Sequence, residues 1–204
     1  MLQTRTVEPR TLGLLKELMS LPMLNSFYLV DGTALALQLG HRVSTDLDLF
    51  TPEPFDPNEL IEKLSEKFDF SVLSEGSAMV ISTINDIKVD FVKMSYPILF
   101  PSILDEQVRM LDIRDIASMK LKAVTQRGNK KDFYDIYFLF QIMSLDEIIQ
   151  LFKEKFKQYE IFHVIKSLTY FEDAENNANP LVFDKTITWQ KVKTEIMRAV
   201  KLLE

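Results

Sequence analysis

The chain has 204 residues, a formal net charge of −6 and no cysteine, and 47% of its residues are hydrophobic. This composition excludes a disordered chain, a disulfide scaffold, a thiolate nucleophile and a cysteine-based zinc site. Two histidines, His41 and His163, are too few for a histidine-rich metal site, and the net negative charge argues against a uniformly basic nucleic-acid-binding surface. Since the chain shows neither a leader pattern nor a long apolar run, we expect a cytoplasmic protein with no membrane contact.

The first 110 residues mix helical and strand patterns. Helices are expected over 8–20, over 33–39 with Gly40 as the closing residue, and over 58–68. Strands are expected over 27–30, 45–50, 70–75, 78–84 and 87–94, with turns at Gly76 and at Asn85-Asp86. Residues 95–112 read as a loop that contains Pro97 and Pro101.

From about residue 111 the pattern is helical. Helices are expected over 115–128 with Asp115 as the N-cap, and over 131–143, 145–156, 160–168 and 188–203, with a polar loop at 172–180. We therefore predict an α+β fold. A mixed sheet with flanking helices would occupy residues 1–110, and a helical domain over 111–204 would complete a cleft.

Three aspartates fall on two of the predicted strands. Asp46 and Asp48 are two residues apart, so an extended backbone places them on one face together with Phe50. Asp90 lies in a second alternating strand, between Val89 and Phe91. Carboxylates on neighbouring strands are suitable ligands for Mg²⁺ and for a two-metal phosphoryl transfer. The plainer alternatives are a chance Asp-x-Asp on a surface strand and an Asp90 that faces water on an edge strand.

A strand–turn–helix precedes these acids. Gly32 lets the backbone approach a phosphate closely, and Thr33 brings a hydroxyl to a helix N-terminus with free N–H groups. Most such turns bind nothing, so this feature gains weight only from its position 13 residues before Asp46.

Residues 31–50, DGTALALQLGHRVSTDLDLF, resemble the signature of polymerase-β-like nucleotidyltransferases, and more narrowly the AbiEii/AbiGii toxin family. Two further segments resemble that family: IKVDFV, which contains Asp90, and the helical motif over 115–139. The resemblance extends over about residues 27–140.

The resemblance implies roles for individual residues. Asp46, Asp48 and Asp90 would bind Mg²⁺ and act in catalysis, with Asp90 helping to activate the attacking hydroxyl. The nucleotide would be bound by Gly32, Thr33, Arg42, Lys120, Arg127, Lys131, Asp132 and Asp135.

The charges of the helical motif support a phosphate-binding wall. Residues 109–131 contain seven Lys or Arg and two Asp, so this stretch is positive within a negative chain. Asp135, inside an aromatic run, is expected to act as a cap or to pair with Lys120, Arg127 or Lys131. Individual charges could equally belong to a solvated helix face.

His41 and Arg42, shortly before the predicted strand over 45–50, allow several interpretations. Arg42 could contact phosphate, orient Asp48, or hold the turn by pairing with Asp46. His41 is expected to have a structural or exposed role rather than to act as a base.

One residue departs from the family pattern. Asp31 stands where the family has its first glycine, and a carboxylate beside a triphosphate repels it unless a cation intervenes. Asp31 therefore points away from the nucleotide or weakens its binding, which puts turnover in question more than the fold.

The resemblance implies a Mg²⁺-dependent nucleotidyltransferase that moves a nucleoside monophosphate from an NTP to an acceptor hydroxyl. The acceptor could be tRNA or another RNA, and the protein would act as the toxin of a pair with a cognate antitoxin. The alternative is a protein of the same fold that binds nucleotide or antitoxin without turnover. A glycosyltransferase, which also uses Asp-x-Asp, is a third reading that the short chain disfavours.

Overall fold

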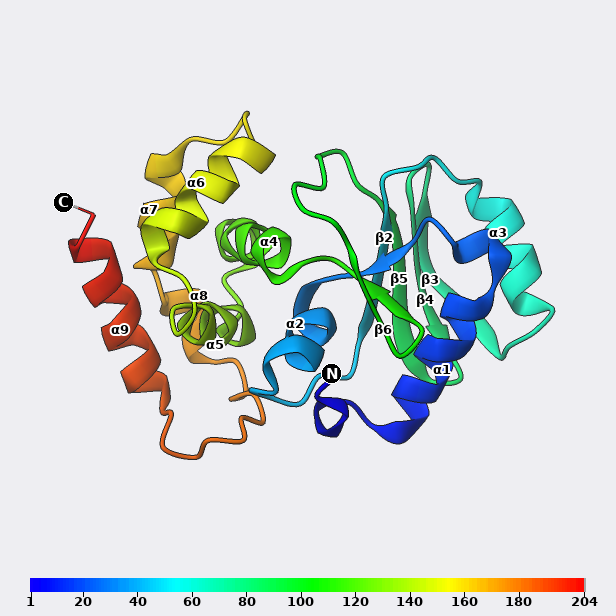
Figure 1. Cartoon of the computed structure of the whole chain (residues 1–204), viewed down its shortest axis with the longest axis horizontal. Helices are drawn as coiled ribbons and strands as arrows, with labels where there is room; N and C mark the ends of the chain where they lie inside the picture. The colour runs from blue at the N-terminus through cyan, green and yellow to red at the C-terminus, as the bar shows by residue number, and fades with distance from the viewer. Residues whose placement is uncertain (204) are drawn as a thin grey trace.

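A seven-stranded mixed sheet and a group of helices form residues 1–203 of the computed structural model (Figure 1). The strands are β1 (Tyr28–Leu29), β2 (Leu47–Thr51), β3 (Phe70–Gly76), β4 (Met79–Ile84), β5 (Ile87–Lys93), β6 (Ile103–Asp105) and β7 (Val108–Met110). The helices are α1 (Pro9–Ser20), α2 (Asp31–Leu39), α3 (Pro57–Ser65), α4 (Ile113–Arg127), α5 (Lys130–Leu139), α6 (Leu145–Lys155), α7 (Ile161–Leu168), α8 (Glu172–Glu175) and α9 (Trp189–Lys201). Glu204, the end of the predicted helical region, lies outside the described residues.

The strand order of the sheet is β3-β4-β5-β2-β1-β7-β6. β2 runs parallel to β5 and antiparallel to β1, whereas β4 pairs antiparallel with both β3 and β5. The two acidic strands are therefore neighbours in the middle of the sheet. This arrangement rules out the reading in which Asp90 faces water on an edge strand.

Helices cover the sheet on both sides (Figure 1). Helix α2 lies between the sheet and the helical half, where it contacts β2, α4 and α5. α1 and α3 lie on the other side, where they contact β7 and β3 respectively. Buried apolar side chains from both halves form one continuous core, in which α4 is the central helix because it contacts α2, α5, α6 and α7.

Several predicted boundaries are confirmed at the residues that carried them. Gly40 ends α2 with a φ of 71°, in the left-handed region that favours glycine. Asn85 and Asp86 both have positive φ, as a two-residue hairpin turn between β4 and β5 requires. None of the helices in the described chain combines the length and apolar character needed to cross a bilayer.

Other boundaries differ from the prediction. The expected loop over 95–112 contains the hairpin of β6 and β7, and the expected loop over 172–180 begins with α8. Helix α2 begins at Asp31 rather than at Thr33, and β2 begins at Leu47, so Asp46 precedes the strand on which it was expected.

The predicted N-cap of α4 is wrong. The helix begins at Ile113, and Asp112 caps it by accepting a hydrogen bond from the Arg114 N–H at 2.9 Å. Asp115 is buried inside the first turn, where its carboxylate accepts from the backbone N–H groups of Leu99 and Phe100 and pairs with Lys155. Asp115 thus ties the loop after β5 to α4 and α6.

We expect Lys155→Met to lower the free energy of unfolding by about 3 kcal/mol, because it leaves the Asp115 carboxylate buried without its cation. Denaturant unfolding measures this change. Lys153→Met, an exposed position on the same helix, is the matched control and should change stability by less than about 0.5 kcal/mol. Equal effects of the two substitutions would contradict a stabilising Asp115–Lys155 pair.

Candidate active site

The turn between β1 and α2 is tightly packed against the segment that leads to the acids. A Cβ at position 32 would lie 2.5 Å from Nη2 of Arg42, so only glycine fits there without displacing that side chain. The Thr33 hydroxyl donates to the backbone carbonyl of Asp46 and lies 2.8 Å from the Ser44 hydroxyl. Thr33 therefore fixes the position of Asp46, and its predicted contact with phosphate stays a prediction.

Asp48 and Asp90 are direct partners in the parallel pairing of β2 and β5. Neighbouring strands lie about 4.8 Å apart, so the two carboxylates leave the same face of the sheet side by side. Burial raises the pKa of Asp48, and the negative charges of Asp31 and Asp90 raise it further, to about 7. Two carboxylates this close repel each other when both are charged, so a bound cation would stabilise the pair.

The Asp90 carboxylate is only half satisfied. Its Oδ2 accepts a hydrogen bond from Nζ of Lys88 at 2.5 Å, whereas its Oδ1 is buried with no hydrogen-bond partner among residues 1–203. Asp46 is more exposed, and its Oδ2 lies 3.5 Å from Nζ of Lys131. Two lysine ammonium groups thus supply positive charge around the three acids.

The donor set at this face fits a hard divalent cation. Carboxylate oxygens are the ligands that Mg²⁺ prefers, and the unpaired Oδ1 of Asp90 is an acceptor with unused capacity. Within residues 1–203, no three Asp, Glu or His side chains are grouped as a complete metal site. Cation binding would therefore require Asp46 to leave Lys131 and join Asp48 and Asp90.

A buried ion cluster lies behind the acids, centred on Asp135. Its two oxygens accept hydrogen bonds from Nε and Nη2 of Arg42, at 2.6 and 2.9 Å, and Oδ2 lies 2.7 Å from Nζ of Lys120. Nε2 of His41 lies 2.8 Å from Oδ1. Burial would raise the pKa of Asp135, but Arg42 and Lys120 outweigh it and hold this pKa well below its usual range.

Asp31 belongs to the same cluster. Its backbone has a φ of 54°, the left-handed conformation for which the family glycine is suited. Its carboxylate pairs with Lys120, and with Arg127 at 3.0 Å, while Asp132 pairs with the same two cations. Burial would raise the pKa of Asp31, but Lys120 and Arg127 lower it to about 2.

The cluster balances its own charge. Three carboxylates, those of Asp31, Asp132 and Asp135, face three permanent cations. Burial lowers the pKa of His41, so its ring stays neutral at pH 7. The cluster therefore has no surplus positive charge to offer a triphosphate.

These contacts correct two expectations and agree with two others. Arg42 pairs with Asp135 rather than with Asp46, Asp48 or solvent. Lys120 is only 1% exposed, so it does not form a wall of the cleft. His41 is buried against Asp135, in the structural role expected of it. The predicted pairing of Asp135 with Lys120 is confirmed.

Most of the basic side chains over 109–131 make contacts inside the protein. Arg109 donates to the backbone carbonyls of Met19, Leu24 and Phe27, and Arg114 pairs with Asp112. Lys130 is buried and donates to the carbonyls of Glu175 and Asn177. Lys122, Arg127 and Lys131 are the members that line pockets.

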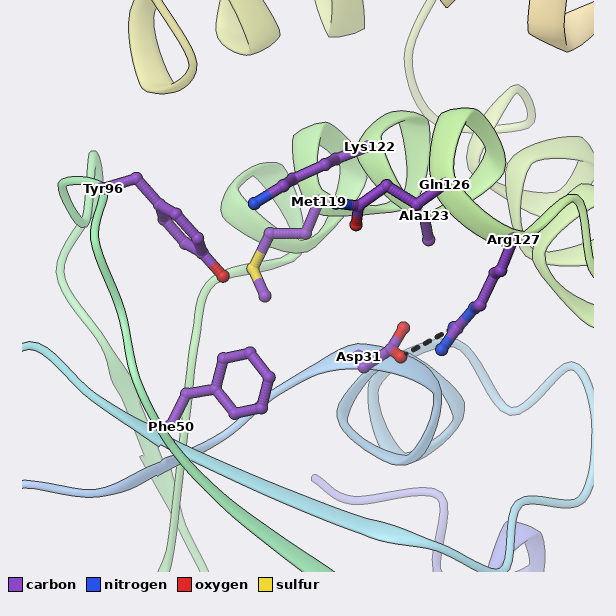
Figure 2. A pocket seen from close by; sticks show the side chains of 8 residues that line it. All are labelled: Asp31, Phe50, Tyr96, Met119, Lys122, Ala123, Gln126 and Arg127. Carbon is purple, nitrogen blue, oxygen red and sulfur yellow. Dashed lines mark hydrogen bonds and ion pairs between the residues drawn. The ribbon is translucent and has the colours of Figure 1, made fainter. Parts of the chain in front are cut away.

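Two pockets lie beside the acids. The first, of about 160 Å³, is lined by Asp31, Phe50, Tyr96, Met119, Lys122, Ala123, Gln126 and Arg127 (Figure 2). The second, of about 360 Å³, contains Asp46 and Lys131 and is bounded by Asn129, Asn177 and Pro180. Strand alternation with Asp48 points to Phe50, whereas no sequence pattern points to Tyr96 or to the segment around Asn177.

Comparisons with known proteins show what the chain is similar to. The family of nucleotidyl transferase AbiEii toxins of type IV toxin–antitoxin systems matches residues 14–202. An uncharacterized protein of Aquifex aeolicus is 36% identical over 193 residues, which is 92% of each chain.

Two solved structures share the fold. JHP933 of Helicobacter pylori is 18% identical with a TM-score of 0.57, and the alignment covers 97% of this chain and 93% of that one. MenT4, a nucleotidyltransferase toxin of Mycobacterium tuberculosis, is 16% identical with a TM-score of 0.55, and the alignment covers 99% and 89%.

The raised pKa of Asp48 predicts a pH-dependent stability. An acid whose pKa in the folded state lies above its usual 3.8 binds its proton more tightly when folded, so stability is lost as pH rises from about 4 to about 7. We expect the Tm in EDTA to fall less over this range in Asp48→Asn than in the wild type. Asp69→Asn, at an exposed position, should keep the wild-type profile, and equal profiles for all three proteins would contradict the prediction.

Proposed function

We propose that this chain, which belongs to the AbiEii nucleotidyl transferase toxin family, moves a nucleoside monophosphate from an NTP to an acceptor hydroxyl. Its membership makes it a nucleotidyltransferase, and the proposal concerns the substrates, the cation and the residues. The observation that supports it best is the pairing of Asp48 with Asp90 in adjacent central strands, with one oxygen of Asp90 lacking a hydrogen-bond partner among the described residues.

The proposed reaction assigns a step to each acid. The acceptor oxygen attacks the α-phosphorus, the bond from that phosphorus to the bridging oxygen breaks, and pyrophosphate leaves. Asp90 takes the acceptor proton and passes it to solvent. Asp46 and Asp48 would hold a divalent cation, for which Mg²⁺ is the first choice, and the cation would supply positive charge to the donor phosphates.

The cation supplies charge that this part of the protein lacks. When bound, it would neutralise the phosphates and align the donor with the acceptor. Lys131 lies beside Asp46 and is the side chain best placed to take over phosphate binding once Asp46 turns to the cation. The backbone N–H groups at the start of α2, from Gly32 onward, are the second candidate.

The proposal extends to an acceptor and a partner. An RNA, tRNA among the candidates, would reach the acids from the side of the second pocket, whose polar lining continues from Asp46 to Asn177. A cognate antitoxin is expected because the family consists of toxins from toxin–antitoxin systems.

One observation favours weak donor binding. Asp31 occupies the cations Lys120 and Arg127, which the resemblance assigns to phosphate. A protein that binds nucleotide or antitoxin without turnover is therefore the second candidate. Transfer of label distinguishes the two, since only the first produces labelled acceptor.

We expect Asp48→Asn to reduce transfer about a thousandfold or more, because it removes a negatively charged ligand of the proposed divalent cation. The assay incubates the protein with Mg²⁺, total RNA and each of the four NTPs labelled at the α-phosphate. Asp69→Asn should retain full activity. Transfer that persists in Asp48→Asn, or that needs no divalent cation, would overturn the proposed mechanism.

We expect Asp31→Gly to tighten NTP binding about tenfold, since it leaves three cations facing two carboxylates and suits a positive φ. Calorimetry with Mg²⁺ and each NTP measures the affinity. Asp31→Asn removes the charge but keeps the side chain, so it separates the electrostatic effect from the backbone effect. Weaker or unchanged binding in both variants would show that Asp31 does not compete with the triphosphate.

A further inference from the structure

We propose that the pocket between Phe50 and Tyr96 binds the nucleoside part of the donor NTP, and that Gln126 influences which base is accepted. This inference rests on the proposed function, because it places the neutral end of the donor whose phosphates meet the acids. It adds a base-recognition site built from residues outside the motif of aspartates and glycine.

The position of Phe50 connects the pocket to the acids. Phe50 lies two residues after Asp48 on β2, so both side chains leave the same face of the sheet, roughly 7 Å apart along the strand. On the adjacent strand, Asp90 pairs with Asp48 and Val92 pairs with Phe50. A nucleotide whose phosphates lie at Asp48 and Asp90 therefore has Phe50 within reach of its sugar and base.

Tyr96 forms the opposite wall and is held rigidly. Its ring packs edge-on against Phe156, with centroids 4.7 Å apart, and the ammonium of Lys122 lies 4.9 Å from the Tyr96 centroid. Lys155 donates to the carbonyl of Pro97 next to it, at 2.6 Å. Burial, together with the charges of Asp31, Asp115 and Asp48, raises the pKa of Tyr96, so its hydroxyl stays a neutral donor.

Figure 2 shows both rings and Met119 directed into one space between β2 and α4, with the Asp31–Arg127 ion pair at its end. An aromatic ring can stack on any nucleobase, because every base has a π-face. The pocket is smaller than a site for a whole drug-sized ligand, which suits a subsite that takes only part of a nucleotide.

The polar groups of the pocket can distinguish bases. The amide of Gln126 extends from α4 toward Met119 in Figure 2 and offers both a donor and an acceptor. Of the two cations that line the pocket, Arg127 is neutralised by Asp31 and Asp132, and Lys122 lies over the ring of Tyr96. The pocket is therefore better suited to a neutral nucleoside than to phosphates.

The test compares each NTP with inorganic tripolyphosphate, which carries the same phosphates without a nucleoside. Both ligands are titrated with Mg²⁺ into the full chain by calorimetry. We expect Phe50→Ala and Tyr96→Ala to weaken NTP binding about tenfold and to leave tripolyphosphate binding unchanged. Tyr96→Phe, which keeps the ring, should bind NTPs like the wild type.

Gln126→Ala should change the ranking of the four NTPs, whereas Gln150→Ala, at an exposed position on α6, should not. Phe162→Ala, 71% exposed on α7, is the control for removing an aromatic ring. If Phe50→Ala does not fold, Phe50→Leu replaces it in the test. Leucine keeps apolar volume but has no π-face, so this variant should also bind NTPs more weakly than the wild type. Unchanged tripolyphosphate binding reports an intact fold.

Two results would overturn the inference, and they are distinguishable. If the pocket variants leave NTP binding unchanged, or weaken NTP and tripolyphosphate equally, the nucleoside lies elsewhere and the proposed function stands. If the wild type binds no NTP and transfers no label, the proposed function and the pocket fail together.

Discussion

The buried carboxylate of Asp135 is the interaction on which the geometry of the site depends. It joins Arg42, which precedes the acidic strand, to Lys120 in the middle of α4, and its oxygens are fully buried between them. A buried charge that loses its partner costs several kcal/mol, so the helical half and the sheet must dock in the arrangement that satisfies all three residues. That docking sets the separation between α4 and β2, and with it the first pocket.

Much of the fold could be predicted from local patterns. Strict alternation predicts the acidic strands. The residue pair Asn85-Asp86 predicts the hairpin turn, because Asn and Asp tolerate the positive φ that both residues adopt. The hairpin of β6 and β7 escaped prediction because its strands have three residues each and its turn, Glu106-Gln107, takes positive φ without the usual Asn or Gly. Asp115 was mistaken for a cap because its partners, Lys155 and the backbone of residues 99–100, are distant in sequence.

The site was predictable only where its residues lie close in sequence. Asp48 and Asp90 could be expected on neighbouring strands, although their direct register is a product of the fold. For Arg42 the sequence suggests Asp46 or Asp48 as the partner, because they are the nearest acids. The actual partner is Asp135, which lies 93 residues away. Tyr96 stands in an irregular segment with no periodicity, so nothing in the sequence connected it with Phe50.

The distribution of charge around the acids leads to a further conclusion about binding order. The ion cluster is neutral within itself, and most of the basic residues of 109–131 are paired inside the fold. The acids, in contrast, carry more negative charge than Lys88 and Lys131 offset, as the raised pKa of Asp48 reflects. A bare triphosphate would meet net repulsion at this face, so cation and nucleotide must bind together, each supplying charge that the other requires.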